Sequence, residues 1–151
     1  MTLPEARRSA AWRTYLRTQY RLLRLVDPLL RSWVHAVGLG NTVELVTAGR
    51  RTGRRRSVLV GLLNVDGAWY VGHPNGPAQW TRNLAAAGHG EVRVRRRRAV
   101  AVRAERLPPG HEREAAILAT FSQHPFPGNA IYWLARRHIQ AVGDYFRLER
   151  F

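Results

Sequence analysis

Hydrophobic and polar positions alternate with helical spacing at the start of the chain. In residues 5–26 apolar side chains recur every three or four positions, and arginines recur on the other side of the same helix. Asp27-Pro28 interrupts this pattern, because proline disfavours helix in the residue before it. A second helical run covers residues 29–37. Residues 1–40 are therefore predicted to form an N-terminal pair of helices.

From residue 42 to residue 107 the spacing changes to that of β-strands. Short runs rich in valine and leucine are separated by glycine-containing turns, and Asp66-Gly67 is a typical hairpin signal. The connections are short, which favours antiparallel pairing. The predicted strands are residues 43–47, 57–65, 68–72, 91–96 and 99–107, with a short helix over residues 78–87.

The last part, residues 108–151, returns to helical spacing and ends in a strand. Pro108-Pro109-Gly110 starts a helix over residues 111–121. Residues 129–138 are interpreted either as a helix or as part of a cap that faces a ligand, and residues 144–148 as a closing strand. With about six antiparallel strands and helices around them, we expect an α+β, mainly β, fold: a small, partly open β-barrel. No repeat or linker divides residues 1–151, so a single domain is expected.

Composition adds a charge argument. The formal charge is +15, and all 25 basic residues are arginine. This excess favours an anionic partner. The use of arginine without any lysine, however, is more typical of a coding bias towards arginine than of selection for nucleic-acid binding. The absence of cysteine excludes a disulfide, a thiol nucleophile and a thiolate metal site. No signal-peptide core and no apolar run of membrane-span length is present, so we expect a cytoplasmic protein.

One loop concentrates this charge between two predicted strands. Residues 49–56, GRRTGRRR, contain two glycines and five arginines. Glycine lets backbone N–H groups converge in turn conformations that other residues avoid, and arginine adds forked donors suited to phosphate or carboxylate. A hairpin turn needs the glycines but not the arginines. The loop is therefore predicted to hold an anionic ligand.

The familiar catalytic and metal-binding motifs are missing. None of the six histidines is spaced as a metal-binding pair, and no metal site is expected. No nucleophile elbow and no glycine-rich nucleotide loop occurs either. If the protein is an enzyme, an organic cofactor is expected to carry the chemistry.

Four motifs occur in a characteristic order. They are the basic loop Thr47–Gly53 with Arg56, the hairpin Asp66-Gly67, the loop Gly72–Gly76, and the helix start Trp80–Leu84. In this order and spacing, over residues 43–107, the chain resembles the deazaflavin (F-420)-dependent nitroreductase family, a branch of the split-barrel flavin and deazaflavin oxidoreductases. Leu59-Val60 replaces the family's Pro-Leu, and Pro74-Asn75 replaces a Ser-Lys pair.

The resemblance implies a split antiparallel β-barrel that binds coenzyme F-420, with FMN as the alternative. It also implies hydride transfer to an electron-poor small molecule such as a quinone, an enone or a nitro compound. The matching cofactor positions are Arg50, Arg51, Thr52 and Arg56 for the phosphate and acidic tail; Ser57, Val58, Leu59, Val60 and Gly61 beside the deazaflavin; Gly72, His73, Pro74 and Asn75 at its edge; and Gln79, Trp80, Thr81, Arg82 and Asn83 at the helix start.

Catalytic residues are poorly indicated by the sequence. Tyr132 and His73 are the two candidates, although a histidine in a turn is more often structural. The run Arg93–Arg98 is interpreted as a solvated hairpin, because it lacks the interleaved aromatic residues of a nucleic-acid site.

Other readings of the chain remain open. One is a non-catalytic carrier of an anionic cofactor with the same fold, and a weaker one is a nucleic-acid or membrane module. The N-terminal helix either packs on its own domain or makes a peripheral contact with an anionic membrane. An exposed sheet edge or the N-terminal helices are compatible with a homodimer.

Overall fold

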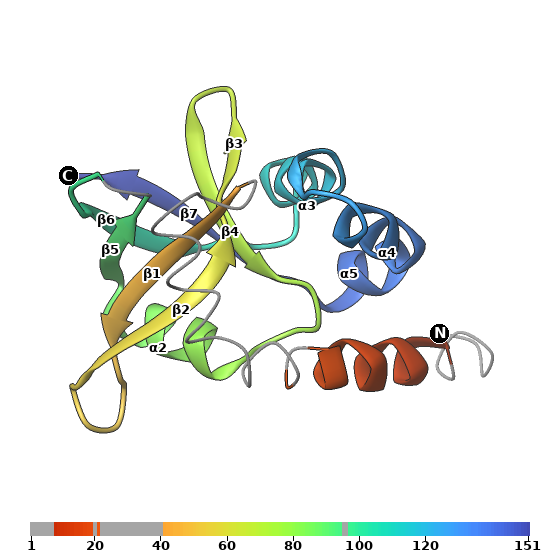
Figure 1. The fold of residues 1–151 in the computed structure, drawn as a ribbon, viewed down its shortest axis with the longest axis horizontal. Coiled ribbons are helices and arrows are strands. Elements are labelled where there is room, and N and C mark those ends of the chain that lie inside the picture. The colour runs from red at the N-terminus through yellow and green to blue at the C-terminus, as the bar shows by residue number, and fades with distance from the viewer. Residues whose placement is uncertain (1–7, 20, 22–40, 95–96) are drawn as a thin grey trace.

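Seven antiparallel strands form one curled sheet, and helices cover one side of it and one end (Figure 1). The computed structural model describes residues 8–19, 21, 41–94 and 97–151, so the helix predicted over residues 29–37 lies outside the described residues. The strands are β1 (Thr42–Ala48), β2 (Arg55–Gly61), β3 (Leu63–Val65), β4 (Ala68–His73), β5 (His89–Arg93), β6 (Val100–Arg106) and β7 (Asp144–Arg150). The helices are α2 (Gln79–Ala87), α3 (His111–Gln123), α4 (Gly128–Leu134) and α5 (Arg136–Val142), together with an N-terminal helix over residues 8–19.

The sheet curls because one extended segment forms both of its edges. The strand order is β2-β1-β5-β6-β7-β4-β3, so β2 and β3 lie at opposite ends although only Leu62 separates them in sequence. Leu62 belongs to neither strand, and its N–H donates to the Asn41 carbonyl (2.8 Å). The single strand predicted over residues 57–65 is therefore wrong in one respect: its first half pairs with β1 and its second half with β4. The predicted mainly β split barrel is confirmed.

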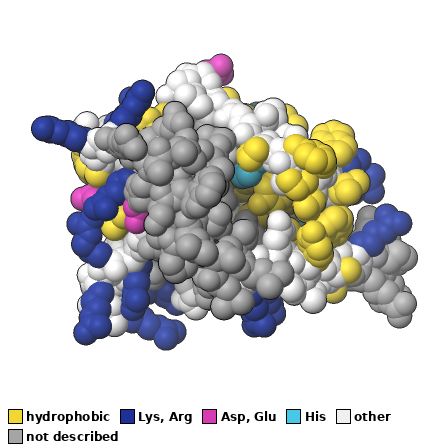
Figure 2. Space-filling model, in the orientation of Figure 1, with side chains coloured by type: hydrophobic (Ala, Val, Ile, Leu, Met, Phe, Trp, Pro, Cys, Tyr) yellow, Lys and Arg dark blue, Asp and Glu magenta, His cyan; other side chains and the backbone are white. Residues whose placement is uncertain are grey.

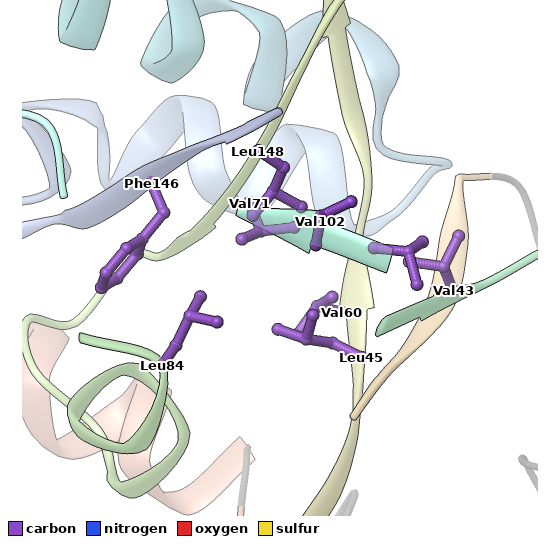
Figure 3. Close-up of a cluster of buried hydrophobic side chains, with 9 residues drawn as sticks. Val43, Leu45, Val60, Val71, Leu84, Val102, Phe146 and Leu148 are labelled. Atoms are coloured by element: carbon purple, nitrogen blue, oxygen red, sulfur yellow. The ribbon is translucent and has the colours of Figure 1, made fainter. Parts of the chain in front are cut away.

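Side chains alternate across the sheet and supply two cores. In β4, Val71 points into the barrel while Tyr70 points out of it, as expected for a pleated strand. The inner core contains Leu84 of α2, which closes one end of the barrel (Figure 3). Its buried members are Val43, Leu45, Val60, Val71, Leu84, Val92, Val102, Phe146 and Leu148.

The outer core joins the sheet to the C-terminal helices. Tyr145 of β7 packs there with Ile117 of α3 and Ile139 of α5, all three almost fully buried. Arg113 of α3 ties α5 to the same layer, since its guanidinium donates to the carbonyls of Gln140 (3.0 Å) and Gly143 (2.9 Å). These contacts fix α3, α4 and α5 beside the open part of the barrel.

The N-terminal helix packs on this outer layer. Leu16 is fully buried, and Trp12 lies against the outer core. Ser9 Oγ is hydrogen-bonded to His138 Nδ1 of α5 at 2.8 Å. Because Leu16 and Trp12 point towards the protein, the structure favours packing of this helix on its own domain over insertion of this face into lipid.

Two elements differ from the prediction. The predicted strand 91–96 is β5, which begins at His89 and ends at Arg93, so part of the arginine run lies beyond the strand. The predicted helix or cap over residues 129–138 is two short helices, α4 and α5, that meet at Ala135. Among the described residues, no helix is long and apolar enough to cross a membrane.

Candidate functional site

A cavity of about 980 Å³ lies against β2 and is enclosed by segments that are distant in sequence. It begins at the basic loop between β1 and β2, follows β2 and the end of β4, and reaches the junction of α3 and α4. Of the residues predicted to bind a cofactor or substrate, those lining it are Arg50, Arg51, Thr52, Arg56, Ser57, Val58, Leu59, Val60, Gly61, Gly72, His73, Pro74, Gln79, Trp80, Asn83 and Tyr132.

The basic loop is a compact turn held by its own backbone. Gly49 N–H donates to the Arg54 carbonyl and Gly53 N–H donates to the Gly49 carbonyl, both at 2.8 Å. Gly53 has φ +69°, a conformation that side chains disfavour. Thr52 Oγ1 accepts from Arg54 N–H (3.3 Å), which closes the turn from the other side. The arginines therefore project from a fixed backbone.

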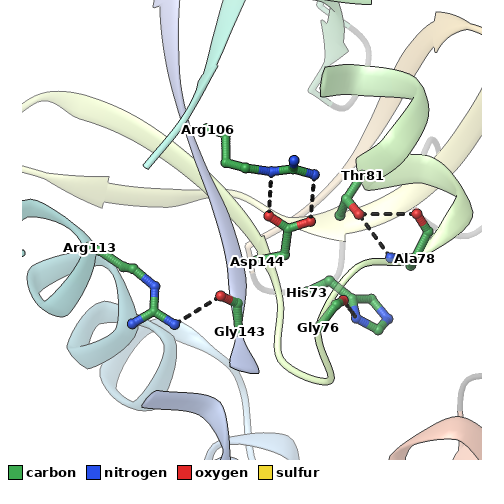
Figure 4. Close-up of polar contacts among 8 residues, drawn as sticks. All are labelled: His73, Gly76, Ala78, Thr81, Arg106, Arg113, Gly143 and Asp144. Atoms are coloured by element: carbon green, nitrogen blue, oxygen red, sulfur yellow. Dashed lines mark hydrogen bonds and ion pairs between the residues drawn. The ribbon is translucent and has the colours of Figure 1, made fainter. Parts of the chain in front are cut away.

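Helix α2 braces this loop. Asn83 Oδ1 accepts two hydrogen bonds from Arg50, one from its backbone N–H (3.2 Å) and one from Nη1 (3.0 Å). The helix itself starts at a turn in which Ala78 N–H donates to Thr81 Oγ1 at 2.8 Å (Figure 4). The position of the loop at the cavity is thus set by α2 as well as by the hairpin.

The loop arginines differ in whether a carboxylate neutralises them. Arg55 points away and pairs with Glu91 at 2.8 Å. Arg51 and Arg56 line the cavity, are exposed, and form no ion pair with any residue that the structure describes. The guanidinium groups of Arg51 and Arg56 are therefore presented to the cavity, and no carboxylate among the described residues pairs with them. This arrangement is what an anionic ligand requires.

His73 is a buried member of the cavity wall, with 9% of its surface exposed. Its Nδ1 is hydrogen-bonded to the Gly76 carbonyl at 2.8 Å, and since a carbonyl only accepts, Nδ1 carries the proton (Figure 4). Burial lowers the pKa of His73, and Asp144 and the Gly76 carbonyl offset this only in part. A neutral ring with its proton on Nδ1 is poorly arranged to donate a proton from Nε2.

The far end of the cavity is aromatic. The rings of His124 and Tyr132 meet edge to face with centroids 5.0 Å apart. Tyr145 lies deeper, and its hydroxyl is hydrogen-bonded to Thr120 Oγ1 at 2.8 Å. Burial lowers the pKa of His124 and raises that of Tyr145, so both side chains are neutral near pH 7. This end suits a flat, uncharged molecule.

Three predicted cofactor residues do not line the cavity. Thr81 is fully buried, and at the start of α2 its hydroxyl accepts from the Ala78 N–H and donates to the Ala78 carbonyl. Asn75 accepts from His138 Nε2 (2.8 Å) and donates to the Arg13 carbonyl (3.0 Å), so its amide joins the loop to other helices. Arg82 follows Thr81 on α2 but is not part of the wall. For Thr81 and Arg82 the position on α2, and for Asn75 its hydrogen bonds to other helices, direct the side chain away from the cavity.

Ten lining residues are not among the individual site candidates, although one of them, Gly49, belongs to the predicted anion-binding loop. Thr42, Thr47, Gly49, Leu63 and Ala78 adjoin predicted residues, and the spacing of the strands could have suggested them. The other five come from α3, β7 and the turn before α4, which reach the cavity only in the folded chain; they are Thr120, His124, Pro125, Pro127 and Tyr145. No group of histidine, aspartate and glutamate residues suited to a metal ion occurs in the described part of the chain.

Comparisons with known proteins agree with this architecture. The family model described as F-420H(2)-dependent quinone reductase matches residues 31–129, more than half of the chain. A solved structure described as a domain-swapped dimer has a TM-score of 0.57 and 18% identity, and the match covers 87% of this chain and 99% of that one. No curated protein sequence matches the chain.

Two further solved structures share the fold. An F-420-H2-dependent reductase, FDR-A, has a TM-score of 0.56 and 20% identity, and the match covers 72% of this chain and 94% of that chain. The heme storage protein HutZ from Vibrio cholerae has a TM-score of 0.55 and 13% identity, and the match covers 83% and 90%. Together with the family match, these results show that the chain belongs to the F-420H(2)-dependent quinone reductase family and is an oxidoreductase whose cofactor is coenzyme F-420.

Proposed function

We propose that the cavity holds coenzyme F-420 along β2, with its anionic tail at the basic loop and its deazaflavin towards the aromatic end. The single observation that carries this proposal is the polarity of the cavity: Arg51 and Arg56 lie at one end, and the rings of His124 and Tyr132 lie at the other. Such a gradient matches a ligand with a charged tail and a flat ring system.

The residues present fit this cofactor at both ends. At the loop, the tight backbone turn and two arginines without described carboxylate partners suit a phosphate and the acidic tail. Along the wall, Gly61 and Gly72 have no side chain, and the rings of His124 and Tyr145 pack directly against them, which brings the aromatic end up to β2 and β4. A cavity of about 980 Å³ also leaves space for a second small molecule.

The substrate that we propose is an electron-poor small molecule of the quinone, enone or nitro class, bound at the aromatic end. When bound, the reduced deazaflavin supplies a hydride, and reduction of a quinone to a hydroquinone also takes one proton. We assign His124 and Tyr132 as the candidate hydrogen-bond donors to the oxygen of such a substrate, because both line this end of the cavity. We assign His73 a structural role, because its Nδ1–H is engaged by Gly76.

Titration of the purified chain with F-420 tests the cofactor assignment. Replacing Arg51 and Arg56 with alanine is expected to weaken binding at least tenfold, since hydrogen bonds to charged groups contribute about 1.5–3 kcal/mol each. The matched control is Arg97→Ala with Arg98→Ala, which removes the same charge from exposed residues away from the cavity. Equal losses in both pairs would mean that general charge, not the loop, binds the cofactor.

Turnover tests the reaction. Reduced F-420 is expected to be oxidised when a quinone, an enone or a nitro compound is added, with a loss of activity in the Arg51/Arg56 variant. Tight cofactor binding without oxidation by any of the three classes would instead indicate a carrier protein. Titration with FMN in parallel checks that F-420 is preferred.

A homodimer remains a prediction. It is supported by the solved structure described as a domain-swapped dimer, which shares this fold. Sedimentation velocity over a range of protein concentrations measures the oligomeric state directly.

A further inference from the structure

Three large apolar side chains are exposed next to the cavity. Phe126 is 81% exposed, Trp133 is 51% exposed and Leu134 is 66% exposed. They lie in the turn before α4 and at the end of that helix, and we call them the apolar rim. Exposed apolar groups gathered in one place are unusual on a protein surface and mark a site of interaction.

The apolar rim is continuous with the aromatic end of the cavity. Pro125 and Pro127, on either side of Phe126, line the cavity and are themselves exposed, so the cavity reaches the surface here. Tyr132 lines the cavity and directly precedes Trp133. Figure 2 shows hydrophobic side chains gathered over α3 and α4 around a hollow. A molecule that crosses the apolar rim therefore enters the proposed substrate end.

The tryptophan of the apolar rim is held in place. Its ring meets Phe121 edge to face at 5.6 Å, and the Arg136 guanidinium lies over it at 4.5 Å from the centroid. Arg136 Nη1 also donates to the Trp133 carbonyl at 3.0 Å. An aromatic ring stacked with arginine beside exposed leucine and phenylalanine is the composition of surfaces that lie in the headgroup region of a membrane.

The segment of chain that carries the apolar rim has charges of one sign. No aspartate or glutamate occurs in the sequence between Glu114 and Asp144, whereas Arg136 and Arg137 follow α4 directly. The N-terminal helix, which is tied to α5 through Ser9 and His138, adds exposed arginines at positions 8, 13 and 17. Such a surface attracts anionic lipid headgroups.

We propose that the apolar rim docks on an anionic lipid bilayer, so that the substrate end of the cavity opens towards the lipid. Phe126 and Leu134 enter the headgroup boundary while the arginines contact lipid phosphates. A quinone dissolved in the bilayer then reaches the cavity without crossing water. Docking stands independently of the proposed function, whereas this delivery of a quinone rests on it.

Vesicle binding tests the docking. The full chain is expected to co-sediment with vesicles of phosphatidylcholine mixed with phosphatidylglycerol, and to bind pure phosphatidylcholine vesicles at least tenfold more weakly. Binding is expected to weaken as salt is added. Phe126→Gln with Leu134→Gln is expected to lower the partition coefficient at least tenfold. Failure of the unmodified chain to bind the anionic vesicles would overturn the proposal, whatever the variants do.

The matched control is Phe151→Gln. Phe151 is 77% exposed, similar to Phe126, but it lies at the C-terminus, away from α4 (Figure 1). Its replacement is expected to leave vesicle binding unchanged, and an equal loss in both variants would overturn the proposal. A second result would also overturn the proposal. If the unmodified chain does not bind vesicles but forms dimers that the Phe126/Leu134 variant cannot form, then a second copy of the chain, and not lipid, covers the apolar rim.

Delivery is tested with two quinones of different tail length. The Phe126/Leu134 variant is expected to oxidise reduced F-420 normally with a water-soluble quinone, and at least fivefold more slowly with a long-tailed quinone held in anionic vesicles. Equal rates of variant and unmodified chain on the vesicle-held quinone would overturn the delivery step. Lack of activity with both quinones in the unmodified chain would instead overturn the proposed function and leave the vesicle-binding result standing.

Discussion

Gly72 shows how a single missing side chain shapes the wall of the cavity. It lies in β4 opposite Tyr145 of β7, and a Cβ placed on it would lie 2.4 Å from the Tyr145 ring. That ring cannot easily yield, because it is almost fully buried and its hydroxyl is hydrogen-bonded to Thr120. The glycine is therefore required by close packing, not by its backbone angle.

Replacing Gly72 with alanine is expected to destabilise the fold by about 1–3 kcal/mol, the usual cost of overpacking a core. Gly128→Ala is the control, because a Cβ there meets only Tyr132 at 4.0 Å and the helix position accepts alanine. Chemical denaturation measures both variants. A Gly72 variant as stable as the Gly128 variant would show that Tyr145 moves more readily than its packing suggests.

At the residue scale the sequence indicates the arginines of the basic loop but not the side chains at the opposite end of the cavity. Arg51 and Arg56 were predicted because five arginines in one loop exceed what a turn needs. His124 and Thr120 carry no such local signal, since they belong to a helix that reaches the cavity only through the outer core. The family resemblance assigns Thr81 to the cofactor together with its neighbours, but one helical turn directs its hydroxyl back to Ala78.

Among the elements, α2 braces the basic loop in addition to the β1–β2 hairpin. Replacing Asn83 with alanine removes the acceptor for both Arg50 hydrogen bonds and should free the loop. Affinity for F-420 is expected to fall about fivefold, corresponding to about 1 kcal/mol for one net hydrogen bond. Calorimetric titration measures the change.

The neighbouring Arg82→Ala is the control for this experiment. Arg82 does not line the cavity, so its removal is expected to change affinity less than twofold. A loss as large as that of the Asn83 variant would restore the sequence-based assignment of Arg82 to the cofactor.

The buried guanidinium of Arg113 links helices α3 and α5, in addition to their apolar contacts in the outer core. Arg113→Met keeps the length of the side chain but leaves the carbonyls of Gln140 and Gly143 without their donor. Since hydrogen bonds from charged groups contribute about 1.5–3 kcal/mol each and two are lost, we expect the free energy of unfolding to fall by at least about 3 kcal/mol. Denaturation monitored by circular dichroism tests this, and an unchanged midpoint would contradict the role given to Arg113.

For the whole molecule, the order of the motifs was enough to predict the barrel. Short hairpins such as Asp66-Gly67 fixed antiparallel pairing, and the alternation along β6 indicated a sheet with one buried face. The break at Leu62 was not predictable, because it arises from closure of the sheet: β2 and β3 read as one strand until their partners are known. The aromatic end of the cavity is likewise a product of closure and of the helices packed around it.

Two histidines of the cavity wall, one buried and one partly buried, make the stability of the whole chain depend on pH. Burial lowers the pKa of both His73 and His124 below the value of about 6.5 that they have in the unfolded chain. Above that pH both rings are neutral in either state and their contribution is constant. As the pH falls below it, the unfolded chain binds protons that the folded chain does not, so the free energy of unfolding decreases.

Each such histidine adds at most about 1.4 kcal/mol per pH unit to this slope. We expect urea denaturation to show the highest stability above pH 7 and a steady loss between pH 6.5 and 5, a range that lies above the titration of Glu112, whose pKa is lowered by Arg147. In His124→Gln one titrating ring is missing, so the slope over this range should become shallower even if the variant is less stable at every pH. A slope equal to that of the unmodified chain would mean that His124 is protonated as readily in the cavity as in water, and would contradict its burial as the cause.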